Sequence, residues 1–311
     1  MQHSVWRHTS LRFCHTAHLA ALGGALLAGL ALPAPALAAT EAPAGSVGGM
    51  GDVNLYPKRV VIDQRSRVAS IGLFNRTGNT GDYDITITDM MMSPDGRLVD
   101  LTSVTDEAQR AQVKAASTML RWSPHRVSLP PNEAQTVRIM SRIPPDLPPG
   151  EYRAHFTAVA VPADAGTGLS IESAVGSTKP DQIGVRIVPR FGISIPVILR
   201  VGETTLSTGF TGFGLTQLPD GRRAVAITIT RQGTRSAFGD ISIAVAGSKK
   251  PIAEIKGIGV YTEINQRAVQ IPLDPATDMR LLAPGARVTV TYTDDDATPG
   301  KILARQEFAV P

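Results

Sequence analysis

The sequence has one cysteine in 311 residues, Cys14, and it lies in an N-terminal segment without acidic residues. That segment, residues 1–38, carries Arg7 and Arg12, then an apolar stretch at 19–32, and ends in Ala36-Leu37-Ala38. These are the features of a secretory signal peptide, and the apolar stretch is too short for a membrane span. Removal of the segment leaves no cysteine, which excludes small disulfide-stapled domains even in an oxidising compartment.

The remaining chain also lacks the features of nucleic-acid-binding proteins and of enzymes. Loss of the segment lowers the net charge from +4 to +2, and no basic cluster alternates with aromatic residues. Only His125 and His155 remain, and no GxSxG, HExxH or P-loop motif accompanies them. We expect both to be ordinary strand and turn residues. Asp294-Asp295-Asp296 lacks the spaced ligands of a calcium loop and is expected to be an exposed hairpin turn. The sequence therefore predicts no enzyme, no metal, no cofactor, no small-molecule substrate and no nucleic-acid partner.

Helical periodicity is almost absent, and short alternating runs separated by turn residues predict an all-β chain. After a disordered leader at 39–51, two immunoglobulin-like β-sandwich domains are expected at 52–201 and 202–311, in a bent arrangement. The strands expected in the first lie at 53–62 (broken near Pro57), 67–74, 83–91, 120–127, 136–142 and 151–161, with a helical turn at 108–116. Those expected in the second lie at 224–230, 239–245, 252–260, 267–272, 287–292 and 302–310.

The longest alternating stretch is IGVRIVPRFGISIPVILR, residues 183–200. Its odd positions are apolar and most of its even positions are polar or glycine, the pattern of one very long strand or of two joined at a kink. Pro189 and Pro196 cannot donate a ladder hydrogen bond, which favours an edge strand. Such an edge can pair with another chain, although the apolar row could instead fill its own core.

Several segments together resemble the periplasmic chaperones of chaperone–usher pilus assembly, the PapD-like family, of which this chain would be a divergent member. They are LYPKRVVI at 55–62, LFN at 73–75, WSPHRVSLPPNEAQTVR at 122–138, EYR at 151–153 and residues 193–200. The resemblance covers the first domain with consistent order and spacing. For the second domain it rests on size, position and strand content.

The resemblance implies that the last strand of the first domain completes the core of an unfinished pilin-like subunit. The donor residues would be Val185, Ile187, Pro189, Phe191 and Ile193. Arg59 matches the arginine that anchors the subunit's C-terminal carboxylate. Pro196 stands where the family has its second anchor, a lysine, and Arg186 and Arg190 are the candidates to replace it.

The resemblance also implies an interdomain ion-pair network of Glu151 and Arg200, with Asp295 or Asp294 as its third member. The loop at 163–181 is longer than in chaperones of rod-like pili. The function implied is that of a periplasmic chaperone that holds pilin-like subunits and delivers them to an outer-membrane usher. The alternative, from a different class, is a secreted two-domain β-sandwich that is itself a structural or adhesive surface protein.

Overall fold

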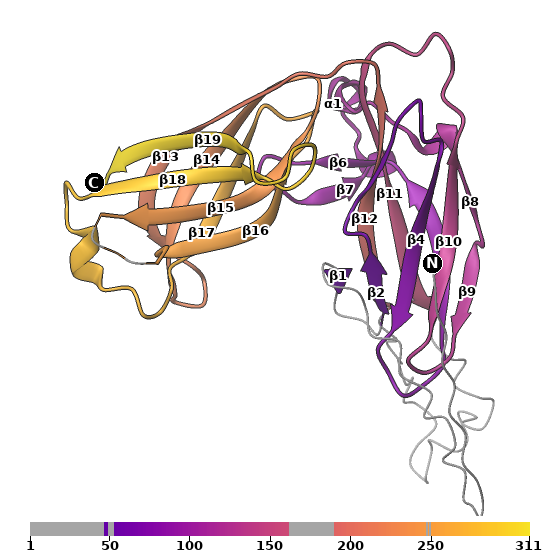
Figure 1. The fold of residues 1–311 in the computed structure, drawn as a ribbon, viewed down its shortest axis with the longest axis horizontal. Helices are drawn as coiled ribbons and strands as arrows, with labels where there is room; N and C mark the ends of the chain where they lie inside the picture. Colours follow the sequence, from indigo (N-terminus) through magenta and orange to yellow (C-terminus); the bar gives the residue numbers. More distant parts are fainter. Residues whose placement is uncertain (1–46, 49–52, 162–189, 247, 249) are drawn as a thin grey trace, which may run out of the picture. The chain divides into compact units, whose positions relative to one another are not determined.

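The computed structural model describes residues 47–48, 53–161, 190–246, 248 and 250–311 (Figure 1). Strands form most of these residues, and the only α-helix among them is α1, Glu107–Gln112. None of the described helices is long and apolar enough to cross a membrane. The four larger sheets form two sandwiches, each around its own apolar core. The expectation of an all-β chain with two sandwiches is therefore confirmed.

The first sandwich is built from two five-stranded sheets. One has the order β1 (Val47–Gly48), β2 (Val53–Tyr56), β4 (Val68–Asn75), β10 (Ala134–Ser141), β8 (Leu120–Ser123). The other has the order β3 (Val60–Ile62), β12 (Gly192–Val201), β11 (Gly150–Val161), β5 (Gly81–Thr88), β9 (Arg126–Leu129). A hairpin of β6 (Met90–Met92) and β7 (Leu98–Asp100) and the short helices η1 (Leu101–Ser103), α1 and η2 (Ser117–Met119) connect them.

The chain changes sheets between β2 and β3, across a cis peptide bond at Tyr56–Pro57. The expected break near Pro57 is therefore a crossing from one layer of the sandwich to the other. Because β3 begins at Val60, the crossing leaves Lys58 and Arg59 outside both sheets, directly before β3. This position determines which groups the two cations can contact.

The second sandwich pairs the sheet β13 (Leu206–Gln217), β14 (Arg223–Gly233), β17 (Gln266–Pro272) with the sheet β16 (Ala253–Val260), β15 (Ala237–Val245), β18 (Arg287–Asp294), β19 (Ile302–Ala309). A short helix, η3 (Met279–Leu282), precedes β18. Figure 1 shows these strands in orange and yellow. The sequence reasoning missed β13, because its glycines break the alternation of apolar and polar residues. Gly212 has a φ of +67°, and the ladder to β14 shifts register between Thr211 and Gly214, as in a β-bulge.

One polar residue of the first sandwich, Asn75, is buried at the end of β4. Its side-chain Nδ2 donates to the main-chain oxygens of Asn79 at 2.7 Å, Leu129 at 3.0 Å and Pro130 at 3.1 Å. The two N–H groups of this buried amide are thus shared among three main-chain oxygens, an arrangement that fixes a loop to a strand. Asn75 therefore joins the β4–β5 turn to the last residue of β9 and to the residue after it.

Candidate functional site

Strand β12 has one edge that is only partly paired. Along its whole length it pairs antiparallel with β11, from Gly150↔Val201 to Val159↔Gly192. On its other side, β3 pairs with it in parallel, and only from Val197 to Leu199. Within the described residues, no strand pairs with 192–196 on that side. We call this stretch the open edge.

The backbone groups that face the open edge follow from the ladder to β11. The main-chain oxygen of Phe191 accepts from the nitrogen of Ala160 at 2.8 Å, so odd-numbered residues exchange their bonds with β11. Gly192, Ser194 and Pro196 therefore direct their backbone groups outward. Because Pro196 has no N–H, its position on this side costs no bond to β11. The predicted edge character of the stretch agrees with this geometry.

The odd-numbered side chains of β12 point into their own sandwich. Ile193, Ile195, Val197 and Leu199 are all buried in the first core. Ile193, one of the predicted donors, is only 7% exposed in the chain alone, and its donor role stays a prediction. Phe191, the next odd residue, is 43% exposed. Val185, Ile187 and Pro189, the other predicted donors, lie outside the described residues, as does Arg186.

Arg59 lies next to the point where β3 begins, and its guanidinium already holds carboxylates. Its Nη2 contacts the Oδ1 of Asp295 and donates to the main-chain oxygen of Asp295 at 2.8 Å. Its Nε lies 3.5 Å from Asp296 Oδ1, and the guanidinium stacks 4.4 Å from the ring centroid of Phe238. The side chain is 9% exposed. The predicted anchor arginine is therefore in an acidic setting supplied by its own chain.

A second cation, Lys58, reaches the same carboxylate as Arg59. Its Nζ contacts Asp295 Oδ2, while its side chain remains 41% exposed. Sequence reasoning missed Lys58, although it precedes Arg59 directly in the quoted LYPKRVVI segment. Only the crossing between the two sheets, which an alternation pattern does not show, brings two consecutive side chains to one carboxylate.

Arg190, one of the candidates to replace the missing lysine, lies elsewhere. Its Nη2 contacts Asp84 at 3.2 Å, and Arg126 contacts the same carboxylate at 2.8 Å. The hydrogen bond from Arg126 holds the pKa of Asp84 below its usual value. Arg190 lies seven positions before Val197, which pairs with Val60. At about 3.3 Å per residue the separation is roughly 20 Å, so Arg190 does not share a carboxylate with Arg59.

Glu151 and Arg200 meet as the resemblance implies, but the third carboxylate is a different one. Arg200 Nε lies 3.3 Å from Glu151 Oε2, and its Nη2 contacts Asp296 rather than Asp295. Burial acts to lower the pKa of Arg200, but its pairing with Asp296 and Glu151 outweighs burial and raises it. Glu151 also accepts hydrogen bonds from the nitrogen and hydroxyl of Ser236.

The turn that begins at Asp294 is therefore not the exposed hairpin turn that the sequence analysis expects. The side chains of Asp295 and Asp296 are 14% and 5% exposed and face arginines and a lysine of the first sandwich. Asp294 is buried and accepts from the nitrogens of Asp296 at 2.8 Å and Thr298 at 3.1 Å. Asp294 thus stabilises the turn itself, whereas Asp295 and Asp296 form ion pairs with residues of the first sandwich. Among the described residues, no group of three or more His, Cys, Asp or Glu could hold a metal ion.

A further buried ion pair, also missed from the sequence, joins β11 to the second sandwich. Arg153 Nη1 donates to Glu263 Oε2 at 3.0 Å and Nη2 donates to Oε1 at 2.6 Å, with both side chains at most 3% exposed. The nitrogen of Met92 donates to Glu263 at 2.8 Å, and the Arg153 guanidinium stacks 3.6 Å from the Tyr261 ring. A bidentate, buried pair fixes geometry, because a carboxylate or a guanidinium left alone there would be very unfavourable.

Each of the two histidine rings contacts an aromatic side chain. His155 is fully buried in β11, with its Nε2 3.4 Å from the Tyr261 hydroxyl. His125 lies between β8 and β9, where its ring meets Trp122 edge-on at 4.8 Å between centroids. His155 is thus a packed strand residue and His125 an exposed turn residue, in line with the expectation of ordinary strand and turn residues.

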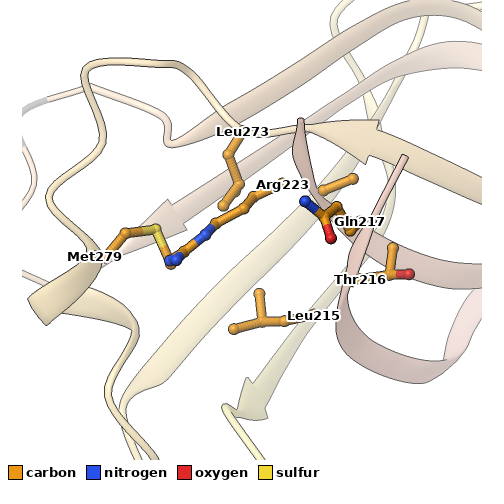
Figure 2. Close-up of a pocket in the computed structure, with 7 residues that line it drawn as sticks. Leu215, Thr216, Gln217, Arg223, Leu273 and Met279 are labelled. Carbon is orange, nitrogen blue, oxygen red and sulfur yellow. The ribbon is translucent and has the colours of Figure 1, made fainter. Parts of the chain in front are cut away.

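An open cavity lies in the second sandwich, where β13 ends and β14 begins. It measures about 310 Å³ and is lined by Leu215, Thr216, Gln217, Arg223, Ala224, Leu273 and Met279. Figure 2 shows the Arg223 side chain extending across it toward Met279, with Leu273 and Leu215 on either side. None of the residues singled out from the sequence lines it. It is thus separate from the open edge and from the ion pairs.

No family model matches the chain, and no curated protein matches its sequence. Among solved structures, the chain is similar to the YadV chaperone, with 13% identity and a TM-score of 0.41 over 83% of this chain and 100% of that one. The chain is also similar to the CupB2 chaperone of Pseudomonas aeruginosa, with 13% identity and a TM-score of 0.40 over 81% of this chain and 97% of that one. A chain of the CsuC–CsuE chaperone–tip adhesion subunit complex of Acinetobacter baumannii matches with 9% identity and a TM-score of 0.42 over 84% of this chain and 98% of that one. In each comparison, nearly the whole of the solved chain is matched.

Proposed function

We propose that this chain is a divergent periplasmic chaperone of the chaperone–usher family, which binds a pilin-like subunit by lending it the edge of β12. The observation that carries the proposal is the open edge, 192–196, with Phe191 exposed at one end and Lys58 and Arg59 at the other. An unpaired edge offers backbone groups to a strand of another protein, and side chains beside it fill pockets in that protein.

The position of β3 defines how such a client strand would lie. Because β3 pairs with β12 on the same side as the open edge, a client strand there lies end to end with β3. Lys58 and Arg59 precede β3, so the end of the client strand nearest Val197 meets two cations. A C-terminal carboxylate is favoured at that end over an N-terminal amine. The client strand therefore runs parallel to β12 and ends at Lys58 and Arg59.

The described part of the edge supplies only part of the binding free energy. The outward N–H and C=O groups of Gly192 and Ser194 provide up to four backbone hydrogen bonds, because the register with β3 already engages the Pro196 carbonyl, and each bond is worth about 0.5–1.5 kcal/mol net. Burial of the exposed Phe191 adds roughly 1–2 kcal/mol. Because association itself costs at least 4 kcal/mol by most estimates, further contacts are needed. The predicted donors Val185, Ile187 and Pro189 directly precede the open edge in sequence and are the candidates to supply them.

The cellular steps around this binding are inferred from the sequence. The segment at 1–38 would direct the chain to the periplasm, and the two sandwiches would act as domains at 52–201 and 202–311. The partners would be a pilin-like subunit and an outer-membrane usher that receives it. The ion pairs of Arg200 and Arg153 would keep the carboxylate-binding residues aligned with β12.

The test is co-expression with each small secreted subunit encoded near the gene, followed by isolation of one-to-one complexes. Phe191→Asp should reduce complex formation at least tenfold and leave thermal unfolding unchanged, because the side chain is already exposed. Ile187→Asp is expected to act in the same way. Val68→Asp is the matched control, since Val68 is 50% exposed on the other sheet. Normal complexes of the Phe191 variant would refute strand lending. Assembly of the chain with itself would instead favour a structural surface protein.

A further inference from the structure

We propose that Asp295 is an internal ligand of the site formed by Lys58 and Arg59, and that the client's terminal carboxylate replaces it on binding. The inference rests on the proposed function, because it concerns the same two cations. The free chain would thus hold its carboxylate site closed with a carboxylate of its own.

The contacts of Asp295 are those of a bound carboxylate. Its two side-chain oxygens contact different cations, Oδ2 the Nζ of Lys58 and Oδ1 the Nη2 of Arg59. No other side-chain cation contacts Asp295 among the described residues. One lysine and one arginine on the two oxygens of a single carboxylate form a site that any accessible carboxylate could occupy.

The neighbouring Asp296 is more deeply buried than Asp295 and lies near more arginines, so it is not the carboxylate that a client would replace. It contacts Arg200, lies 3.5 Å from Arg59 and 3.9 Å from Arg235, and its side chain is 5% exposed. Asp295 is 14% exposed and shares its site with Lys58, which is 41% exposed. An incoming anion therefore reaches Lys58 and Asp295 first. When Asp295 leaves, Asp296 still faces Arg59, so the buried guanidinium keeps a counter-ion.

Replacement of one carboxylate by another costs little, because the number of charge-assisted hydrogen bonds on the cations is unchanged. Asp295 lies in the turn between β18 and β19, where its side chain can rotate into solvent while its nitrogen keeps the 3.2 Å bond to Phe238. The internal ligand thus excludes small anions from the site. A client strand, which gains the open edge in addition, can still displace it.

Asp295→Asn tests the inference, because it keeps the shape of the side chain and removes the competing charge. The probes are two fluorescein-labelled heptapeptides of alternating valine and threonine, one with a free C-terminal carboxylate and one amidated. Fluorescence anisotropy with the wild-type chain should give the two peptides similar affinities. In Asp295→Asn the free carboxylate should be preferred about tenfold, and Lys58→Met in that background should abolish the preference. Asp220→Asn, which removes the exposed pair with Arg222, is the control and should change nothing.

If the amidated peptide binds but Asp295→Asn creates no preference, the internal ligand is refuted and strand lending stands. If neither peptide binds any variant, the open edge alone binds too weakly for this probe, and the response of Arg59 to acetate then tests the site. The Nε–H resonance of Arg59 should shift at about tenfold lower acetate concentration in Asp295→Asn than in the wild type. Equal acetate responses, with thermal unfolding showing that the variant is folded, would overturn the inference.

Discussion

His155 is a buried base whose surroundings allow only its neutral form. Burial, the larger cause, and the charge of Arg153 lower its pKa from 6.5 to about 3. Its Nδ1 has no hydrogen-bond partner among the described residues, and its other ring nitrogen faces a phenol. A proton taken up at this position would therefore be poorly compensated.

The consequence is a loss of stability in mild acid. Between pH 6.5 and pH 3 the unfolded chain binds the His155 proton and the folded chain does not, so stability falls as the pH falls through this window. Between pH 7 and pH 5 the loss is about 2 kcal/mol. Urea unfolding of wild type and His155→Gln at both pH values measures it, because carboxylate titrations cancel in the comparison. An equal pH dependence of the two proteins would contradict the assignment.

At the scale of the element, β12 has one side committed to β11 and one side partly free. Ser194 directs its N–H outward and Ile195 directs its N–H toward β11. The two residues are adjacent, yet a proline should destabilise the chain much less at Ser194 than at Ile195.

Ser194→Pro should leave the fold intact, at a cost of about 1 kcal/mol that includes the lost 3.0 Å bond from Thr157, while it blocks strand pairing with a client. Ile195→Pro should destabilise the chain by about 3 kcal/mol or more, because it removes a ladder bond and a buried side chain. Urea unfolding and complex formation with the co-expressed subunit measure the two effects. Equal destabilisation by the two prolines would show that the assignment of which β12 residues bond to β11 is wrong.

The alternation of residues predicts the strands but not their partners. It places 193–199 on an edge with an apolar row, and the structure confirms the strand. Whether Ile193 fills its own core or another protein's depends on the other sheet, which local pattern does not describe. In the same way, EYRAHF at 151–156 reads as a strand, while the partner of Arg153 is Glu263, 110 residues further on. Arg200 pairs with Asp296 and not with the predicted Asp295, because the conformation of one turn decides which of these neighbours faces it. Strand β13 was not predicted, because a bulge near Gly212 interrupts its alternation of apolar and polar residues.

At the scale of the whole molecule, a small apolar cluster joins residues of both sandwiches. Met92 and Ile198 come from the first, and Phe238 and Tyr261 from the second; all four are buried. The ring of Tyr261 also meets two polar side chains, Arg153 and His155, besides the ring of Phe238. Each sandwich has its own core, so we expect this cluster and the buried ion pairs to contribute most of the coupling between their unfolding transitions.

We expect wild-type unfolding to be a single transition and Tyr261→Ala to divide it in two. Loss of a buried aromatic side chain costs about 3–5 kcal/mol, and here the cost falls on the contacts between the sandwiches. Trp122 fluorescence reports the first sandwich and far-UV circular dichroism reports both, so coincident urea curves should separate in the variant. Tyr56→Ala, which removes a 42% exposed ring, is the control. Coincident curves in Tyr261→Ala would show that the coupling lies elsewhere.

The short pairing of β3 with β12 has a consequence for clients of different size. Because β3 occupies the edge of β12 from Val197 onward, every client strand would have to end at the same position beside β3. A longer client strand could extend only in the opposite direction. Subunits whose last strands differ in length would therefore share one end point and differ in how far they extend toward Arg190. On the proposed function, the chain would thus align each subunit by its C-terminus, and length differences among subunits would be tolerated at the opposite end.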